Sequence, residues 1–142
     1  MKKTLQTGLL FLLALLIAAS FGSCADAPET DALWEDAAYT ADTTLGDGAK
    51  TVEVEVKAGE QSVTCTVKTD KTTLGDALLE HGLIAGDEGP YGLYLKTVNG
   101  ILADYDVDQS YWAFYKDGEM MMVGVDGADI ADGEHYELVY TK

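Results

Sequence analysis

Hydrophobic and polar residues alternate strictly in two short segments of the chain, residues 51–57 and 62–68. Alternation with a period of two is typical of strands that bury one face and expose the other. We therefore predict a β-hairpin, with residues 58–61 as its loop, that pairs the apolar positions of the two strands: Val56 with Val63, Val54 with Cys65 and Val52 with Val67. Cys65 is then expected to be a small core residue, not a reactive thiol.

The next segment carries the spacing and the end signals of a short helix. Its apolar positions share one helical face: Leu74, Ala77 and Leu78. Thr72 or Thr73 is suited to the N-cap, and Gly82 suits the left-handed conformation that ends a helix. His81, in the last turn, is expected to be a surface residue or a residue with satisfied hydrogen bonds, and not a ligand.

The most distinctive stretch is residues 111–124, where two apolar runs flank Asp117-Gly118. This dipeptide favours a type I′ turn, because both of its residues tolerate a positive φ. The resulting register pairs residues on two faces: Lys116 with Glu119, Phe114 with Met121 and Trp112 with Val123 on one face, and Tyr115 with Met120, Ala113 with Met122 and Tyr111 with Gly124 on the other. Both faces are apolar, so we expect a second layer, a partner or a ligand to cover the second face.

Three further segments complete the predicted fold. Residues 91–105 contain a second hairpin signal at Asn99-Gly100, residues 83–90 have the composition of a loop, and residues 135–141 alternate as a last strand. Hairpins combined with a single helix predict an α+β domain, specifically a β-grasp-like mixed sheet of hairpins with one short helix.

The N-terminal residues predict export. Residues 1–23 have the positive start, the apolar run and the small residues of a secretory signal, and the run is shorter than the roughly 20 residues of a membrane-spanning helix. The Ser23-Cys24 step resembles a lipoprotein signal, which implies lipidation of Cys24 and a membrane anchor on the outside face; cleavage by the general signal peptidase is the alternative. Residues 24–50 are polar and aperiodic, so we predict a flexible tether followed by a domain over residues 51–142.

The charge of the chain narrows the classes of partner. The sequence contains 9 Lys, no Arg and 25 acidic residues, for a formal net charge of −16. Removal of Lys2 and Lys3 with the signal leaves 7 basic against 25 acidic residues, a net charge of −18. A surface this acidic excludes nucleic acid as a partner and disfavours anionic ligands that need an arginine fork.

One group of aspartates resembles part of a calcium loop. Asp104, Asp106 and Asp108 match the first three ligands of such a loop. The match then fails, because Gln109 stands where the loop requires Gly and Tyr115 where it requires a bidentate Glu. We therefore expect a solvated loop at this position.

Other chemical motifs are few. Met120, Met121 and Met122 suit packing on a binding surface better than a copper site, because no His or Cys is near them in sequence. The sequence has no phosphate-binding loop, serine elbow or metal-ligand helix. We therefore expect no enzymatic activity, no cofactor and no metal site.

A series of short motifs resembles one protein family. The motifs are Thr73-Leu74-Gly75-Asp76-Ala77-Leu78, Tyr91-Gly92, Val98-Asn99-Gly100, Tyr111-Trp112-Ala113-Phe114-Tyr115, Asp117-Gly118, Gly124-Val125 and Asp132-Gly133. In this order and spacing they make residues 51–142 resemble the transcobalamin-like C-terminal domain family of secreted and lipid-anchored bacterial proteins. The resemblance implies a β-grasp-like domain related to the smaller half of the animal cobalamin carriers, with its ligand near the Tyr-Trp hairpin. The chain has no room for the larger helical half, so cobalamin, the ligand that the resemblance implies, is expected to bind weakly or together with another protein.

Residue types then select the candidate binding face. Trp112, Phe114 and Val123 are the better core residues, whereas the opposite face combines apolar area with polar tips. We predict ligand-binding residues on that opposite face and beside it: Tyr111, Tyr115, Met120, Met122, Tyr91 and Tyr94. If a second sheet of the domain covers this face, it offers no site.

The predicted function is that of a cell-surface lipoprotein module that binds a corrinoid or another small nutrient for handover to a membrane transporter. The alternative is an adhesion or protein-interaction domain whose aromatic face meets a surface protein or polymer. A concave aromatic site would favour the small ligand, and a flat exposed patch would favour the protein partner.

Overall fold

The computed structural model describes residues 32–142 and contains one large and one small sheet. The large sheet has six strands in the spatial order β1-β3-β2-β9-β7-β8. Their bounds are, in that order, Thr43–Gly46, Gln61–Thr69, Lys50–Ala58, His135–Thr141, Tyr111–Lys116 and Glu119–Met120. The last strand in the chain, β9, therefore lies near the centre of the sheet, parallel to β2 and antiparallel to β7.

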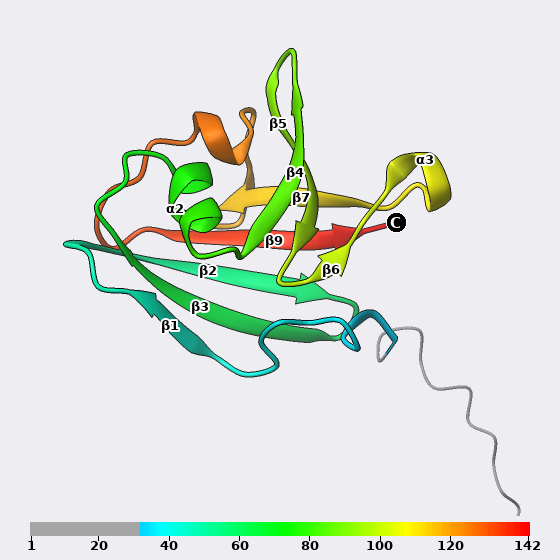
Figure 1. Cartoon of the computed structure of the whole chain (residues 1–142), viewed down its shortest axis with the longest axis horizontal. Helices are drawn as coiled ribbons and strands as arrows, with labels where there is room; N and C mark the ends of the chain where they lie inside the picture. The colour runs from blue at the N-terminus through cyan, green and yellow to red at the C-terminus, as the bar shows by residue number, and fades with distance from the viewer. Residues whose placement is uncertain (1–31) are drawn as a thin grey trace, which may run out of the picture.

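A second layer covers one face of this sheet (Figure 1). It consists of helix α2 and the three-stranded antiparallel sheet β4-β5-β6, with bounds Leu74–Glu80, Ile84–Gly89, Gly92–Val98 and Ile101–Leu102. Short helix α3 (Tyr105–Asp108) and the 3₁₀ turn η1 (Val125–Gly127) lie in the connections. The α+β class is confirmed, with two short helices where one was predicted.

The β2–β3 hairpin forms in the predicted register. Val56 pairs with Val63, Val54 with Cys65 and Val52 with Val67. The side chains of the large sheet that face the second layer include seven with no solvent exposure: Val52, Val54, Val56, Cys65, Val67, Tyr136 and Leu138. Burial raises the pKa of the Cys65 thiol to about 11, which confirms its place in the core and makes it a poor nucleophile.

The end signals of the predicted helix are also confirmed. The hydroxyl oxygen of Thr73 accepts a hydrogen bond from the backbone N–H of Asp76 at 3.2 Å, so Thr73 is the N-cap of α2. Gly82 follows the helix with a φ of +65°. Leu74, Ala77 and Leu78 are fully buried against the large sheet.

Both predicted type I′ hairpins are present. Asn99 and Gly100 have φ angles of 52° and 80°, and Asp117 and Gly118 have φ angles of 50° and 82°. The second hairpin is shorter than predicted. Its paired residues are Tyr115 with Met120 and Lys116 with Glu119, and a single backbone hydrogen bond from Met121 to Phe114 extends the contact.

The register predicted beyond Met121 is wrong. Trp112 and Ala113 pair with Tyr140 and Val139 of β9, and no strand continues along their other side among residues 121–124. After Met121 the chain leaves the sheet and leads to η1, which contacts β5.

The predicted loop over residues 83–90 is instead largely a strand. β4 pairs with β5 from Ile84 opposite Val98 to Gly89 opposite Gly92, with a register shift at Ala85 and Gly86. Its sequence has low strand propensity, so the pairing arises from the neighbouring strand and the turn at residues 90–91 and not from local preference.

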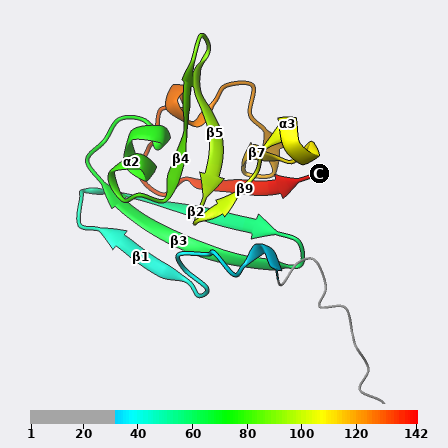
Figure 2. The ribbon, with the colours of Figure 1, turned by 45° about the vertical axis from the view of Figure 1, so that its right-hand side comes forward.

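Part of the predicted tether is folded. Trp34 is buried in the core, and its indole Nε1 donates a hydrogen bond to the carbonyl of Ala58 at 2.9 Å. Strand β1 pairs in parallel with β3, and residues 32–42 lie beside the β2–β3 hairpin (Figure 2). The predicted signal over residues 1–23 and the lipidation site Cys24 lie outside the described residues.

Between residues 32 and 142, none of the helices has the length and apolar character needed to cross a bilayer.

Candidate functional site

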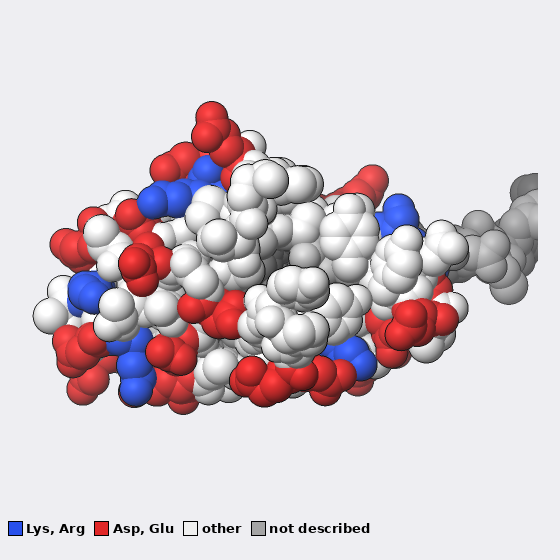
Figure 3. All heavy atoms as spheres, turned by 90° about the horizontal axis from the view of Figure 1, so that it is seen from above, with Lys and Arg blue, Asp and Glu red and all other residues white. Residues whose placement is uncertain are grey.

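An apolar groove opens between the small sheet and the β7–β8 hairpin. Its volume is about 310 Å³, and it is lined by residues of β5, β7 and the segment from β8 to η1: Leu93, Tyr94, Leu95, Tyr111, Trp112, Ala113, Phe114, Met120, Met121, Val123, Gly124 and Val125. Seen from above, uncharged side chains surround a hollow, and acidic side chains lie toward the rim (Figure 3). The groove exists because β8 ends at Met120 and leaves one side of β7 uncovered.

Two buried aromatic residues of β7 form the floor of the groove. Trp112 meets Tyr140 edge to face, with ring centroids 5.7 Å apart, and Phe114 stacks on Tyr136 at the same separation. Trp112 is 7% exposed and Phe114 9% exposed. Packing against β9 therefore fixes both rings before any ligand arrives, which reduces the entropy lost on binding.

The opposite wall is held in place by one carboxylate. Asp126 Oδ2 accepts a hydrogen bond from the backbone N–H of Leu93 at 3.0 Å and so joins η1 to β5. Gly92 allows this approach, because a Cβ on it would lie 2.3 Å from Asp126 Oδ2, and its φ is +104°. The Leu93 wall is therefore positioned by a contact between segments 33 residues apart.

The floor contains a polar group without a partner. Trp112 Nε1 is buried and donates no hydrogen bond, and His81 Nε2 is the other such side-chain atom among residues 32–142. A buried donor without an acceptor costs about 1–3 kcal/mol, so it is uncommon unless a ligand or water satisfies it. By contrast, the buried indole of Trp34 has its acceptor.

The structure brings together three of the six predicted ligand residues. Tyr94, Tyr111 and Met120 line the groove. Tyr115, Met122 and Tyr91 do not line it: Tyr115 is half-buried, and Met122 and Tyr91 are 94% and 100% exposed.

The groove also includes residues from the hairpin face that was predicted to belong to the core only. Trp112 and Phe114, predicted as core only, are buried and line the groove, together with the half-exposed Val123. The sequence missed the wall formed by Leu93 and Leu95, although their alternation along 92–98 placed them on one face of a strand.

Two of the three aspartates of the calcium-like loop accept hydrogen bonds within the loop. Asp104 is the N-cap of α3 and accepts a hydrogen bond from the Asp106 N–H at 3.1 Å. Asp108 accepts hydrogen bonds from the hydroxyl and the backbone N–H of Ser110, which lower its pKa. Asp106 is exposed.

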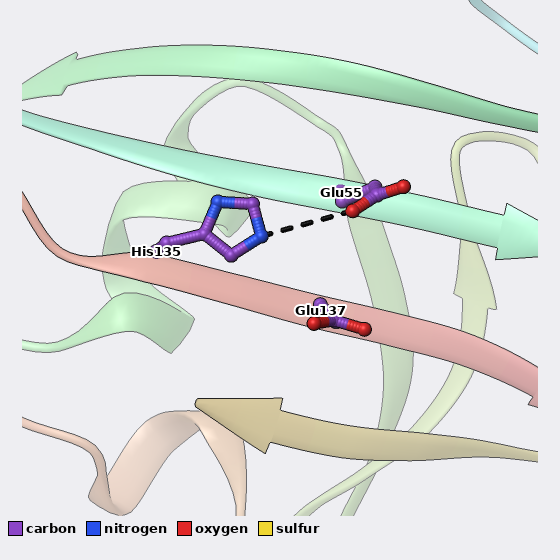
Figure 4. Close-up of side chains that lie close together, drawn as sticks. All are labelled: Glu55, His135 and Glu137. Carbon is purple, nitrogen blue, oxygen red and sulfur yellow. Dashed lines mark ion pairs between the residues drawn. The ribbon is translucent and has the colours of Figure 1, made fainter. Parts of the chain in front are cut away.

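A cluster on the opposite face of the large sheet was not predicted. One ligand atom from each of Glu55, His135 and Glu137 lies within 4.8 Å of the others, the single group of this kind found among residues 32–142 (Figure 4). Glu55 and Glu137 are 82 residues apart in the chain, so only the parallel pairing of β2 with β9 reveals it. The available signal was that each segment places acidic or His residues at alternate positions.

Two proteins of known structure are similar to this chain over about two thirds of its length. A protein from Ruminococcus gnavus ATCC 29149, described as a putative metal binding protein, is 33% identical, with a TM-score of 0.63 over 66% of this chain and 98% of that one. Haptocorrin in complex with Cbi is 19% identical, with a TM-score of 0.53 over 68% of this chain and 26% of haptocorrin, and shares the fold.

No curated protein matches the chain in sequence. The profile of the domain of unknown function DUF4430 matches residues 71–142, which include α2, the small sheet, both groove walls and β9. The chain therefore belongs to the DUF4430 family.

Proposed function

We propose that this protein is a ligand-binding module whose groove holds a small, flat and largely apolar molecule that carries a hydrogen-bond acceptor. The observation that carries the proposal is Trp112, which lines the groove with a fixed ring and a buried N–H that has no acceptor. A ligand oxygen at hydrogen-bonding distance from Nε1 would satisfy this donor.

The size of the groove and the net charge of the chain restrict the class of ligand further. A volume of about 310 Å³ lies at the low end of the range for small-molecule sites, so the groove encloses part of a large ligand or the whole of a small one. The net charge of −16 disfavours anions. We therefore expect a neutral or cationic ligand.

A corrinoid is the first candidate. Haptocorrin in complex with Cbi shares the fold of this chain, and the motifs described above resemble transcobalamin-like C-terminal domains. The chain spans 26% of haptocorrin, so a corrinoid would contact this domain over one side and leave the other side for a second protein. Handover to a membrane transporter is consistent with such one-sided binding.

The anchor places this activity at the cell surface. With Cys24 lipidated, the module is held on the outer face of the membrane, where nutrients are captured. Labelling with a fatty-acid analogue should mark the wild-type chain and not Cys24→Ser. Equal labelling of the two would remove the anchor from the proposal.

Calorimetry of the full chain with cobalamin and cobinamide tests the ligand. Met120→Ala should weaken binding several-fold because Met120 lines the groove, whereas Met122→Ala, at an exposed position outside it, should not. Trp112→Phe keeps an aromatic ring but removes the N–H, and loss of that hydrogen bond should cost about 0.5–1.5 kcal/mol, or roughly two- to twelvefold in affinity.

Absence of heat with both corrinoids at high concentration would reject the corrinoid. Equal losses for Met120→Ala and Met122→Ala would reject the groove as the site. Binding of a surface protein that depends on the exposed Tyr91 and Met122 would instead favour the interaction-domain alternative.

Metal binding is the second candidate function. The relative from R. gnavus, described as a putative metal binding protein, is 33% identical, and this chain covers 98% of it. That description supports a test of metal binding by this chain and identifies none of its residues.

A further inference from the structure

Four ionisable side chains are placed on the outer face of the large sheet by strand register. Glu55 of β2 pairs with Glu137 of β9, and Glu53 pairs with His135 two residues earlier in β9. Because side chains alternate along a strand, all four project from the same face, opposite to the face that carries the core and the groove. Their arrangement follows from the backbone and not from the conformation of a loop.

Three of these side chains converge on one point. His135 Nε2 lies 3.7 Å from Glu55 Oε2 (Figure 4), and a ligand atom of Glu137 lies within 4.8 Å of the ligand atoms of both. The side chains of Glu55, His135 and Glu137 are 24%, 34% and 19% exposed. An ion could therefore reach them from solvent and retain water as a further ligand.

One lysine forms ion pairs with two of the carboxylates. Lys57 Nζ donates to Glu137 Oε2 at 2.9 Å and lies 3.6 Å from Glu55 Oε2. The hydrogen bond to Glu137 is the main cause of the raised pKa of Lys57. Two carboxylates that face each other across paired strands repel, so this place in the sheet selects a cation.

The histidine has an orienting group on its other nitrogen. Glu53 Oε2 lies 3.5 Å from His135 Nδ1. A carboxylate beside one imidazole nitrogen favours a proton there and leaves Nε2 free to act as a ligand, an arrangement common around protein-bound metals. The single ammonium of Lys57 faces both Glu55 and Glu137, so the three carboxylates of Glu53, Glu55 and Glu137 are only partly neutralised.

We propose that Glu55, His135 and Glu137 bind a divalent transition metal ion of the zinc type, in competition with Lys57. Imidazole and carboxylate are both common zinc ligands, and three protein ligands with open positions are typical of accessible zinc sites. Bonds of about 2.0–2.2 Å require the ligand atoms to approach by roughly 1 Å, which side-chain rotation of partly exposed residues allows. Calcium and magnesium prefer oxygen-only sites and should bind more weakly.

The inference rests on the second candidate function and is independent of the groove. Titration of the full chain with Zn²⁺ by calorimetry, and with Co²⁺ by visible absorption, tests it. His135→Gln should lower zinc affinity about tenfold or more, by analogy with the 10- to 100-fold losses seen when metal sites are altered. His81→Gln is the matched control, because His81 is the other histidine and lies outside the cluster.

Lys57→Gln makes the sharper test. Removing the competing ammonium should raise zinc affinity about 1.4- to fivefold, the range expected from an exposed ion pair of about 0.2–1 kcal/mol. A merely structural role for Lys57 would give no gain. Circular dichroism should show unchanged folding in all three variants.

The outcomes separate the site from the function. Zinc binding that is weakened by His135→Gln, strengthened by Lys57→Gln and unaffected by His81→Gln supports the proposal. Tight zinc binding that none of the three variants changes overturns the site and keeps metal binding. No heat and no Co²⁺ spectrum at millimolar metal overturn both.

Discussion

Asn99 and Tyr39 are joined by two hydrogen bonds of 2.8 Å, in which Asn99 Nδ2 donates to the Tyr39 carbonyl and Oδ1 accepts from the Tyr39 N–H. The Asn99 side chain thus pairs with a backbone 60 residues away as a neighbouring strand would. Asn99 is fully buried and has a φ of 52°, so one residue both forms the β5–β6 turn and holds the N-terminal segment.

We expect Asn99→Asp to destabilise the fold by about 3 kcal/mol. The substitution replaces a donor by a carboxylate oxygen that faces the Tyr39 carbonyl, and it buries a charge without a partner. Urea denaturation measures the change. Asp117→Asn, at the exposed position of the other type I′ turn, is the control and should change stability by less than about 0.5 kcal/mol.

Trp34 should be needed for full stability although it precedes the domain predicted from sequence. Trp34→Ala should cost about 3–5 kcal/mol, the range for removal of a large buried ring. Trp34→Phe should cost less, because it loses chiefly the hydrogen bond to Ala58. A fragment of residues 51–142 with the same unfolding midpoint as the whole chain would contradict this expectation.

Asp126→Ala should loosen the Leu93 wall of the groove. The Leu93 N–H loses its acceptor, so we expect a loss of about 1–2 kcal/mol and faster hydrogen exchange at that amide. Asp129→Ala alters an exposed aspartate nearby in the same segment and serves as the control. If exchange at Leu93 is the same in both variants, Asp126 does not position the wall.

Glu134 should make the free energy of unfolding depend on pH in the acid range. Burial opposes its ionisation, but hydrogen bonds from Lys116, Tyr136 and the Ala131 N–H outweigh burial and lower its pKa from 4.5 to about 2. A lowered pKa in the folded state gives stability that is present above about pH 4.5 and is lost as the pH falls toward 2.

Glu134→Gln should therefore flatten the decline in unfolding free energy over this acid range. We expect the wild-type chain to lose about 1–2 kcal/mol more than the variant, less than the full shift implies because the Glu134 side chain is 21% exposed and screened by solvent. Thermal unfolding at several pH values measures it. Glu119→Gln, at the exposed hairpin turn, should leave the acid dependence unchanged.

Elements with local signals could be predicted from the sequence. The Asp117-Gly118 and Asn99-Gly100 turns, the β2–β3 register and the Thr73 cap depend on residues within a few positions of one another. Strand β4 lacks such a signal, because Ile84 is its sole large apolar residue and its pairing partner decides its conformation. The docking of Trp34 was missed for the same reason: one aromatic in a polar segment has no period.

The groove was predicted in part because some of its residues lie close to one another in the sequence. Tyr111 and Met120 belong to the hairpin that the sequence revealed, but the groove also needs Leu93, which lies on another strand and is bonded to Asp126, 33 residues away. Met122 was predicted from an ideal two-stranded ribbon, and the ribbon ends too early. Tyr115 pairs with Met120 as predicted, but it does not line the groove. Pairing between β2 and β9 could not be inferred from either strand alone, so the cluster at His135 was not predicted.

Because β9 lies near the centre of the large sheet, the sheet cannot be completed until β9 has been synthesised. Every other strand precedes it in the chain, yet it joins β2 to β7 and separates the two halves of the large sheet. A partly synthesised chain therefore holds only the β1–β3 half and the hairpins, with no bridge between them. Such late closure, which depends on contacts distant in sequence, slows folding.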